Sequence, residues 1–339
     1  MIAPIEWKGD TLCILDQTVL PHQLEYINTD DYRVVIEAIK SLRVRGAPAI
    51  GIAAAYGIAL AARKIHTEQV VEFKRKLESV LHEFAASRPT AVNLFKAIDR
   101  MRNAVIGCST TTGMVQALER EAKEIHETER ESTRLISKYG AELIKDGFTI
   151  LTHCNAGPLA TGGYGTALGI IMTAAGQGKR IEVLSCETRP LLQGARLTTW
   201  ELLQNKIPIK LIIDSAAGYY LHSKKIDCVI IGADRIAANG DTANKIGSYT
   251  HAVTAYANKI PFYVAAPVST IDLTIKSGSG ITIEERSSVE VTDIGGVKFA
   301  PDKIDALNPA FDVTPARYIS AIITEKGIIQ KPFRKNLKK

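Results

Sequence analysis

The second half of the chain alternates short apolar runs with segments of helical periodicity. Each run ends in polar residues, as in FTILTHCN (148–155), IEVLSCETRP (181–190), PIKLIID (208–214) and CVIIGADR (228–235). Near-continuous apolar runs are typical of parallel strands covered on both faces, and their alternation with helices predicts a doubly wound α/β sheet. PFYVAAP (261–267) and SVEVTDIGG (288–296) are expected to extend this sheet, and VTPARYISAIITEKGII (313–329) to form a closing helix and a short strand.

The first half of the chain has a different pattern, which predicts a smaller, mainly helical domain with a few short strands. Short apolar runs between Thr11 and Tyr32 predict two or three strands, and a helix is expected to begin near Asp31. A charged helical stretch from about residue 112 to 146 is typical of segments that bridge domains. We therefore expect an N-terminal domain over residues 1–125 and a C-terminal Rossmann-like domain over residues 126–339.

Composition narrows the class of protein. Hydrophobic residues make up 46% of the 339 residues, and no apolar segment has membrane-spanning length or signal-peptide character, so a cytoplasmic location is expected. The five cysteines are scattered without a CxxC pair, so neither a disulfide framework nor a metal site is predicted. The net charge of +6 suits an anionic ligand, but much of the excess lies in the terminal KPFRKNLKK, and no nucleic-acid or membrane partner is expected.

Polar residues at the ends of the predicted strands are candidates for catalysis and binding. Asp234 is the first polar residue after the run Val229–Ile231, and Cys154 follows the first strand of the sheet. In open α/β sheets, ligands bind beyond the carboxyl ends of the strands. Asn244 and Lys245 precede a predicted helix, and an amide, an ammonium group and a helix N-terminus together favour phosphate. Simpler interpretations stay open, because Asp234 suits a capping role and Cys154 suits a buried, inert thiol.

Three further motifs carry weaker signals. Arg45, Gly46 and Ala47 form a turn ahead of a small-residue helix, and Arg88 stands at another helix entry, where a guanidinium group is placed to reach an anion. The glycine-rich segment GPLATGGYGTALG has Leu168 in the third position of GxGxxG, so the dinucleotide fingerprint is incomplete. His153 adjoins Cys154, but neighbouring strand residues point to opposite faces, which favours a structural role for His153.

Taken together, the motifs resemble a known family. RGAPAIG (45–51), RPTAVNL (88–94), THCNAG (152–157), ETRP (187–190), GADRI (232–236) and NKIGSY (244–249) are similar, in order and spacing, to the methylthioribose-1-phosphate isomerases. The resemblance covers nearly the whole chain. This family is similar in fold to the α, β and δ regulatory subunits of the eukaryotic initiation-factor exchange factor and to ribose-1,5-bisphosphate isomerases.

The resemblance implies a reaction and a role for each matching residue. The expected activity is the aldose–ketose isomerisation of 5-methylthioribose 1-phosphate to 5-methylthioribulose 1-phosphate in methionine salvage, by a homodimer without a cofactor. Asp234 matches the family's proton donor and Cys154 its second catalytic group. The positions that match substrate-binding residues are Arg45, Gly46, Ala47, Arg88, Gln193, Asn244 and Lys245.

The chemistry of the expected substrate leads to a hypothesis for the mechanism. Phosphate blocks the anomeric carbon of an aldose 1-phosphate, so the enzyme must assist ring opening; a protonated Asp234 with a raised pKa would donate to the ring oxygen. Cys154 would then either remove the proton from carbon 2 or stabilise a hydride transfer. Two rival interpretations also stay open: an isomerase of another 5-substituted ribose 1-phosphate, and a non-catalytic regulatory subunit.

Overall fold

The computed structural model describes residues 2–89 and 91–338, and these residues divide into two compact units. Unit 1 comprises residues 1–131 and 158–164, and unit 2 comprises residues 132–157 and 165–339. Among the described residues, no helix combines the length and the apolar character that a membrane crossing requires. The predicted boundary between independent domains, at residue 126, stays a prediction.

Unit 1 consists mainly of helices that enclose one very apolar helix, α2 (Ala47–Arg63), whose residues 49–62 are all buried. The expected helix near Asp31 is confirmed: α1 begins at Tyr32, and the Asp31 side chain accepts a hydrogen bond of 2.9 Å from the N–H of Arg33. The strands of its antiparallel sheet are β1 (Ile5–Trp7), β2 (Leu12–Leu15) and β3 (Tyr26–Thr29). The other helices are α1 (Tyr32–Lys40), α3 (Val70–Ala85), α4 (Val92–Ala104), the first part of α5 (Thr111–Ala141) and α6 (Pro158–Thr161).

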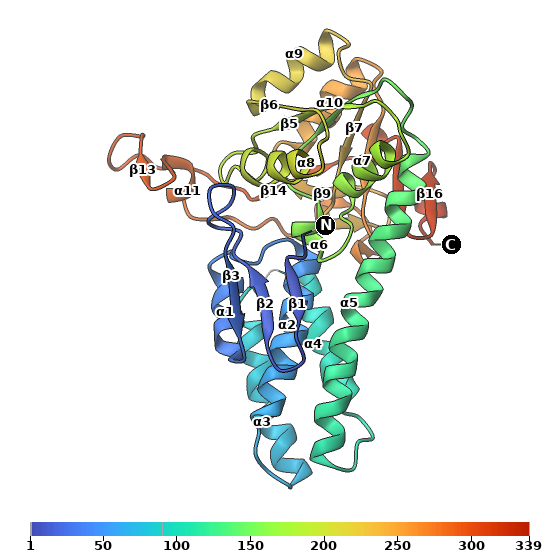
Figure 1. Ribbon diagram of the computed structural model, residues 1–339. Coiled ribbons are helices and arrows are strands. Elements are labelled where there is room, and N and C mark those ends of the chain that lie inside the picture. Colours follow the sequence, from blue (N-terminus) through green and yellow to red (C-terminus); the bar gives the residue numbers. More distant parts are fainter. Residues whose placement is uncertain (1, 90, 339) are drawn as a thin grey trace. The chain divides into compact units, whose positions relative to one another are not determined.

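Unit 2 contains a seven-stranded sheet in the order β16-β15-β10-β7-β4-β5-β6 (Figure 1). All neighbouring strands are parallel except β15 and β16, so the chain has the expected mixed α/β fold with a parallel sheet. From β4 the chain adds strands in one direction as far as β6, and then returns to add β7, β10 and β15 on the other side of β4. The strands are β4 (Thr149–Thr152), β5 (Glu182–Cys186), β6 (Ile209–Ile212), β7 (Cys228–Ile231), β10 (Phe262–Ala265), β15 (Ala321–Thr324) and β16 (Gly327–Gln330).

Both faces of this sheet are buried, because successive strand residues belong to different apolar clusters. Leu151 and Val229 pack in a cluster with residues of α9, α10 and α12. Ile150 and Ile230 pack in a second cluster with residues of α5, α7 and α8. The near-continuous apolar runs of the sequence follow from this double coverage. The helices are α7 (Ala167–Gly176), α8 (Thr199–Gln204), α9 (Ala217–His222), α10 (Ser248–Ala257) and α12 (Phe333–Asn336).

Two expectations for the last 50 residues are wrong. SVEVTDIGG does not extend the main sheet: it forms the helical turn α11 (Val289–Thr292) and a small hairpin, and the Arg286 side chain holds the turn by hydrogen bonds of 3.0 Å to Glu290. The expected closing helix is instead strand β14 (Phe311–Thr314), a short 3-10 turn and the strand pair β15–β16. Apolar runs this short fit a strand as well as a helix, so periodicity did not separate them.

A second, four-stranded sheet extends from the end of β7. Its order is β11-β8-β9-β14, and β8 and β9 form an antiparallel hairpin. These strands are β8 (Arg235–Ala237), β9 (Thr242–Lys245) and β11 (Ile271–Asp272), with β12 (Asp293–Ile294) and β13 (Val297–Lys298) in the separate hairpin.

Candidate active site

Cys154 lies two residues beyond β4, in a backbone conformation that is rare for a residue with a side chain. Its φ is +65°, in the left-handed region. Its N–H donates a hydrogen bond of 2.8 Å to Oγ1 of Thr188, and its carbonyl accepts one of 2.6 Å from Oγ1 of Thr198. The half-buried cysteine is therefore held by its backbone on both sides.

Asp234 lies three residues beyond β7, the neighbour of β4 in the sheet. The two strands are paired in parallel through Thr152 and Ile230, so their carboxyl ends share one edge. The segments that follow them also meet, because a Cβ atom added to Gly232 would lie 3.0 Å from the Cβ of Ala156. Asp234 is half-buried. Its N–H donates a hydrogen bond of 2.9 Å to the carbonyl of Ala243, and this bond begins the β8–β9 hairpin.

Gln193 is almost completely buried, with 7% of its surface exposed. Its side-chain oxygen Oε1 has no hydrogen-bond partner within the described residues. Its backbone position is fixed by the next residue, Gly194, since a Cβ there would lie 1.8 Å from the carbonyl oxygen of Cys186. A buried acceptor without a partner destabilises the protein unless a ligand completes its hydrogen bond.

Asn244 and Lys245 are adjacent residues of β9 and are both buried. Nδ2 of Asn244 donates to Oγ of Ser248 at 2.9 Å, and Nζ of Lys245 lies 4.7 Å from the centre of the Phe311 ring. An ammonium group in such a place attracts an anion more strongly than an exposed one, because little water screens it.

Two N–H groups at the N-terminus of α10 have a partner within the protein, and the phosphate site expected there stays a prediction. The N–H groups of Gly247 and Tyr249 donate to the carboxyl group of Asp312 at 2.7 and 3.0 Å. Burial raises the pKa of Asp312 to about 6. The Asp312 carboxyl group therefore occupies these two N–H groups, and Lys245 stays the predicted anion-binding residue of this segment.

The other predicted binding residues belong to unit 1. Gly46 is the N-cap of α2 with a φ of +92°, and a Cβ at this position would lie 2.4 Å from the carbonyl oxygen of Ala160. Arg45 precedes this glycine, and Arg88 lies between α3 and α4; both arginines are half-buried. The predicted site residues of unit 1 are thus Arg45, Gly46, Ala47 and Arg88, and those of unit 2 are Cys154, Gln193, Asp234, Asn244 and Lys245.

Thr188, Thr198 and Asp214 support the cysteine, and sequence reasoning did not select them. The two carboxyl oxygens of Asp214 accept hydrogen bonds of 2.8 and 2.7 Å from the N–H groups of Thr188 and Arg189. Thr188 then presents the oxygen that receives the N–H of Cys154. The available signal was the position of ETRP directly after an apolar run.

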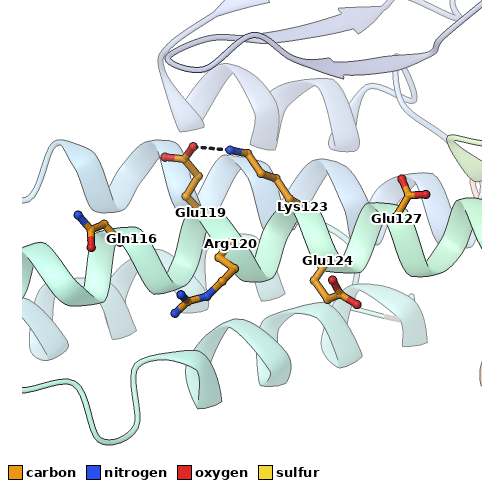
Figure 2. Close-up of a pocket in the computed structure, with 6 residues that line it drawn as sticks. All are labelled: Gln116, Glu119, Arg120, Lys123, Glu124 and Glu127. Carbon is orange, nitrogen blue, oxygen red and sulfur yellow. Dashed lines mark hydrogen bonds and ion pairs between the residues drawn. The ribbon is translucent and has the colours of Figure 1, made fainter.

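A hollow of about 490 Å³ on α5 is a poor phosphate site. Six side chains of this helix line it (Figure 2), three of them glutamates and two of them basic. Lys123 donates to Glu119 at 2.8 Å, and the Glu119 carboxylate also pairs with Arg63. The three glutamates match the charges of Arg120, Lys123 and Arg63, which leaves no excess positive charge for an anion, so we assign no ligand to this hollow.

Comparisons with known proteins agree with the motifs. The model of the Initiation factor 2 subunit family matches residues 43–331. A methylthioribose-1-phosphate isomerase from Dehalococcoides mccartyi is 56% identical over 96% of this chain and 98% of its own length. Among solved structures, 5-methylthioribose 1-phosphate isomerase from Pyrococcus horikoshii OT3 is 42% identical with a TM-score of 0.93, and covers 100% of this chain and 95% of its own. A structure titled translation initiation factor eIF-2B, subunit delta, from A. fulgidus is 44% identical with a TM-score of 0.91, and each chain covers 100% of the other. The chain therefore belongs to the Initiation factor 2 subunit family and, within it, to the methylthioribose-1-phosphate isomerases.

Proposed function

We propose that this protein is an aldose–ketose isomerase that converts 5-methylthioribose 1-phosphate to 5-methylthioribulose 1-phosphate, a step of methionine salvage. The observation that carries the proposal is the placement of Cys154 and Asp234. Both follow neighbouring parallel strands at one edge of the sheet, in a chain that is 52–56% identical to full-length isomerases.

The strand order supports a Rossmann-like, doubly wound arrangement. Counted along the chain, the parallel strands β4, β5, β6, β7, β10 and β15 stand in the order 3-2-1-4-5-6, with helices packed on both faces. In such sheets the ligand crevice opens where the strand order reverses, because the loops on the two sides diverge there. The reversal falls between β4 and β7, the strands that lead to Cys154 and Asp234.

In the proposed mechanism, Asp234 carries a proton in the free enzyme and donates it to the ring oxygen as the sugar ring opens. Cys154 then acts at carbon 2. As a thiolate it removes the carbon-bound proton and forms an enol phosphate; in the alternative route, a hydride moves from carbon 2 to carbon 1 and Cys154 stabilises the transition state. The protein's own groups supply the chemistry on either route, and the proposal includes no cofactor.

Substrate binding in the proposal uses the remaining predicted residues. Oε1 of Gln193 accepts a hydrogen bond from a sugar hydroxyl, and Asn244 contributes its side-chain amide. In unit 2, the Lys245 ammonium group binds the phosphate by charge, and in unit 1 Arg45, Gly46, Ala47 and Arg88 stay predicted substrate-binding residues. We further propose that the enzyme is a cytoplasmic homodimer.

The test compares turnover and binding in two variants. Asp234→Asn and Cys154→Ser should each lower kcat by about 10²–10⁴ while substrate binding, measured by calorimetry, changes little, because the lost group acts in the transition state. Asp10→Asn, in an exposed turn, and Cys108→Ser, in unit 1, are matched controls that should retain full turnover. Normal turnover of Asp234→Asn would remove the proton donor from the mechanism.

Deuterated water separates the two routes at carbon 2. Solvent deuterium at carbon 1 of the ketose, detected by NMR, indicates proton removal by Cys154, whereas its complete absence indicates hydride transfer. Turnover of 5-deoxyribose 1-phosphate and ribose 1,5-bisphosphate, compared with that of the methylthio sugar, measures the preference for the methylthio group. A pocket discriminates only weakly between this group and a smaller one.

A regulatory role without turnover is the second candidate function, because the related A. fulgidus structure carries an initiation-factor title. The catalytic pair opposes this role, since a binding module needs neither a thiol nor a carboxyl group at the strand ends. Purified protein that turns over none of the three sugars, yet binds a phosphorylated ligand, would favour the regulatory role.

A further inference from the structure

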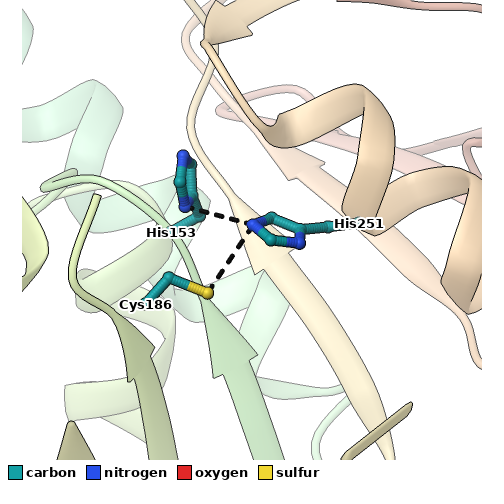
Figure 3. A group of neighbouring side chains, drawn as sticks. All are labelled: His153, Cys186 and His251. Atoms are coloured by element: carbon teal, nitrogen blue, oxygen red, sulfur yellow. Dashed lines mark hydrogen bonds between the residues drawn. The ribbon is translucent and has the colours of Figure 1, made fainter. Parts of the chain in front are cut away.

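A cluster of three metal-binding side chains lies beside the proposed active site and has no part in the proposed reaction. His153 lies just beyond β4, Cys186 ends β5 and His251 lies on α10. All three are at least 97% buried, and their side-chain nitrogen and sulfur atoms point toward one another (Figure 3). His251 thus contacts Cys186, 65 residues away in the sequence, and His153, 98 residues away. No local sequence motif predicts these contacts.

Two of the distances within the cluster match those between ligands of one metal ion. Nε2 of His251 lies 3.2 Å from Nδ1 of His153 and 3.6 Å from Sγ of Cys186, and all three atoms lie within 4.8 Å of one another. Bond lengths of about 2.0 Å to nitrogen and about 2.3 Å to sulfur place tetrahedral zinc ligands about 3.3 Å (N to N) and about 3.6 Å (N to S) apart.

The surroundings of His153 also fit a metal ligand. Its Nε2–H donates a hydrogen bond of 2.8 Å to the carbonyl of Ile246, which leaves a lone pair on Nδ1, the atom that faces the cluster. Metal-bound histidines usually orient their second nitrogen toward such a carbonyl. Oδ1 of Asp214 lies 3.8 Å from the same Nδ1, so this carboxylate, whose side chain is 28% exposed, offers a fourth ligand.

We propose that Nδ1 of His153, Nε2 of His251 and Sγ of Cys186, with the Asp214 carboxylate in the fourth position, bind one divalent transition-metal ion of the Zn²⁺ type. Two imidazoles and a thiolate form a donor set that selects Zn²⁺ or Co²⁺ over Mg²⁺ or Ca²⁺. The sequence predicted no metal site, and the proposal differs from that expectation.

The protonation states define what binding requires. Burial lowers the pKa of His153 to about 4 and that of His251 to about 3, so both rings are neutral at physiological pH and available as ligands. Burial raises the pKa of the Cys186 thiol, which is therefore protonated without a cation. When the metal–sulfur bond forms, the thiol proton leaves to solvent, and the His251 ring proton moves from Nε2 to Nδ1. Binding thus releases one proton per ion.

The expected consequence is stabilisation of the edge that carries Cys154. The ion would join the ends of β4 and β5 to α10, directly before Cys154 and two residues before Thr188, whose hydroxyl receives the N–H of Cys154. Because the ion would bind the folded chain and contact no reacting group, its primary effect is on stability rather than on the reaction.

The experiment uses the full chain, stripped of metal by a chelator and then titrated with Co²⁺ or Zn²⁺. Co²⁺ should produce one equivalent of a near-ultraviolet sulfur-to-cobalt charge-transfer band, and Zn²⁺ should displace it and raise the Tm. Cys186→Ala should abolish the band. Cys228→Ala removes an equally buried thiol of β7 outside the cluster and should retain the band.

His251→Gln is the second variant and should weaken Zn²⁺ binding at least about tenfold, with the folded state checked by circular dichroism. The proposal is overturned if the wild-type chain shows no charge-transfer band, or if Cys186→Ala retains it. In that case the cluster is a buried hydrogen-bonded group and nothing more. The outcome is independent of the isomerase assay, because it is read from cobalt spectra and thermal unfolding.

Discussion

Replacing Gln193 with Met should have opposite effects on stability and on catalysis. Oε1 of Gln193 is buried without a partner, so the free protein bears the cost of removing it from water. Met has nearly the same volume and no polar atom to leave unpaired. The variant should therefore be more stable than the wild-type chain, although it loses a hydrogen bond to the proposed substrate.

The size of each effect follows from the burial of the side chain. A buried acceptor without a partner costs about 1–3 kcal/mol, so Gln193→Met should raise the free energy of unfolding by roughly 1–2 kcal/mol after small packing losses. A hydrogen bond between neutral groups contributes about 0.5–1.5 kcal/mol, so kcat/KM for the sugar phosphate should fall about 2- to 10-fold.

The assay is urea unfolding of the free protein together with steady-state kinetics on 5-methylthioribose 1-phosphate. Gln204→Met, at the exposed end of α8, is the matched control and should change neither quantity appreciably. Adding a saturating substrate analogue should remove the stability advantage of Gln193→Met, because the analogue completes the hydrogen bond only in the wild-type chain. A variant that is less stable than the wild-type chain and has unchanged kcat/KM would refute the reasoning.

Three further predictions concern stability. Gly46→Ala should lower the free energy of unfolding by about 1–3 kcal/mol more than Gly9→Ala. Both glycines have positive φ, but only Gly46 lies close to a carbonyl group, that of Ala160. Chemical denaturation measures both variants, and equal losses of stability would contradict the predicted clash. The pKa of Asp312, raised to about 6, means that its contribution is complete below pH 4 and is lost as the pH rises through about 6. Relative to Asp312→Asn, the wild-type chain should lose about 2–3 kcal/mol between pH 4 and 7, and a flat difference would show that the carboxyl group titrates normally. Asp31→Ala should cost about 1 kcal/mol through loss of the cap on α1, an effect that Asp10→Ala in an exposed turn should lack.

The parallel sheet and the placement of the catalytic candidates could be predicted from sequence for one physical reason. Strands buried on both faces are mostly apolar, so Cys154 and Asp234 are conspicuous where the apolar runs end. The same logic failed after residue 288, where the chain forms a helical turn with hydrogen bonds from Arg286 to Glu290, and no apolar pattern records that contact.

Features that depend on long-range contacts could not be predicted in this way. The lack of a hydrogen-bond partner for Oε1 of Gln193 depends on the residues around it. The contact of His153 with His251 joins positions 98 residues apart. Sequence reasoning assigned His153 a structural role because Cys154 would point to the opposite face of a continuous strand. The strand ends at Thr152, however, and the chain then adopts another conformation, so the period of two does not apply to this pair.

Backbone strain and hydrogen bonding at Cys154 support the proposed active site without reference to any family resemblance. Cys154 and Thr188 both have a φ of +65°, although neither is glycine, and each such conformation costs on the order of 1–3 kcal/mol. A folded chain keeps this strain only where other contacts enforce it, and here the two residues enforce it on each other through the bond from Cys154 N–H to Thr188 Oγ1, with Asp214 fixing Thr188 in turn. A buried, inert thiol requires no such support. The strained pair therefore favours a thiol whose direction matters, as the proposed action of Cys154 at carbon 2 requires.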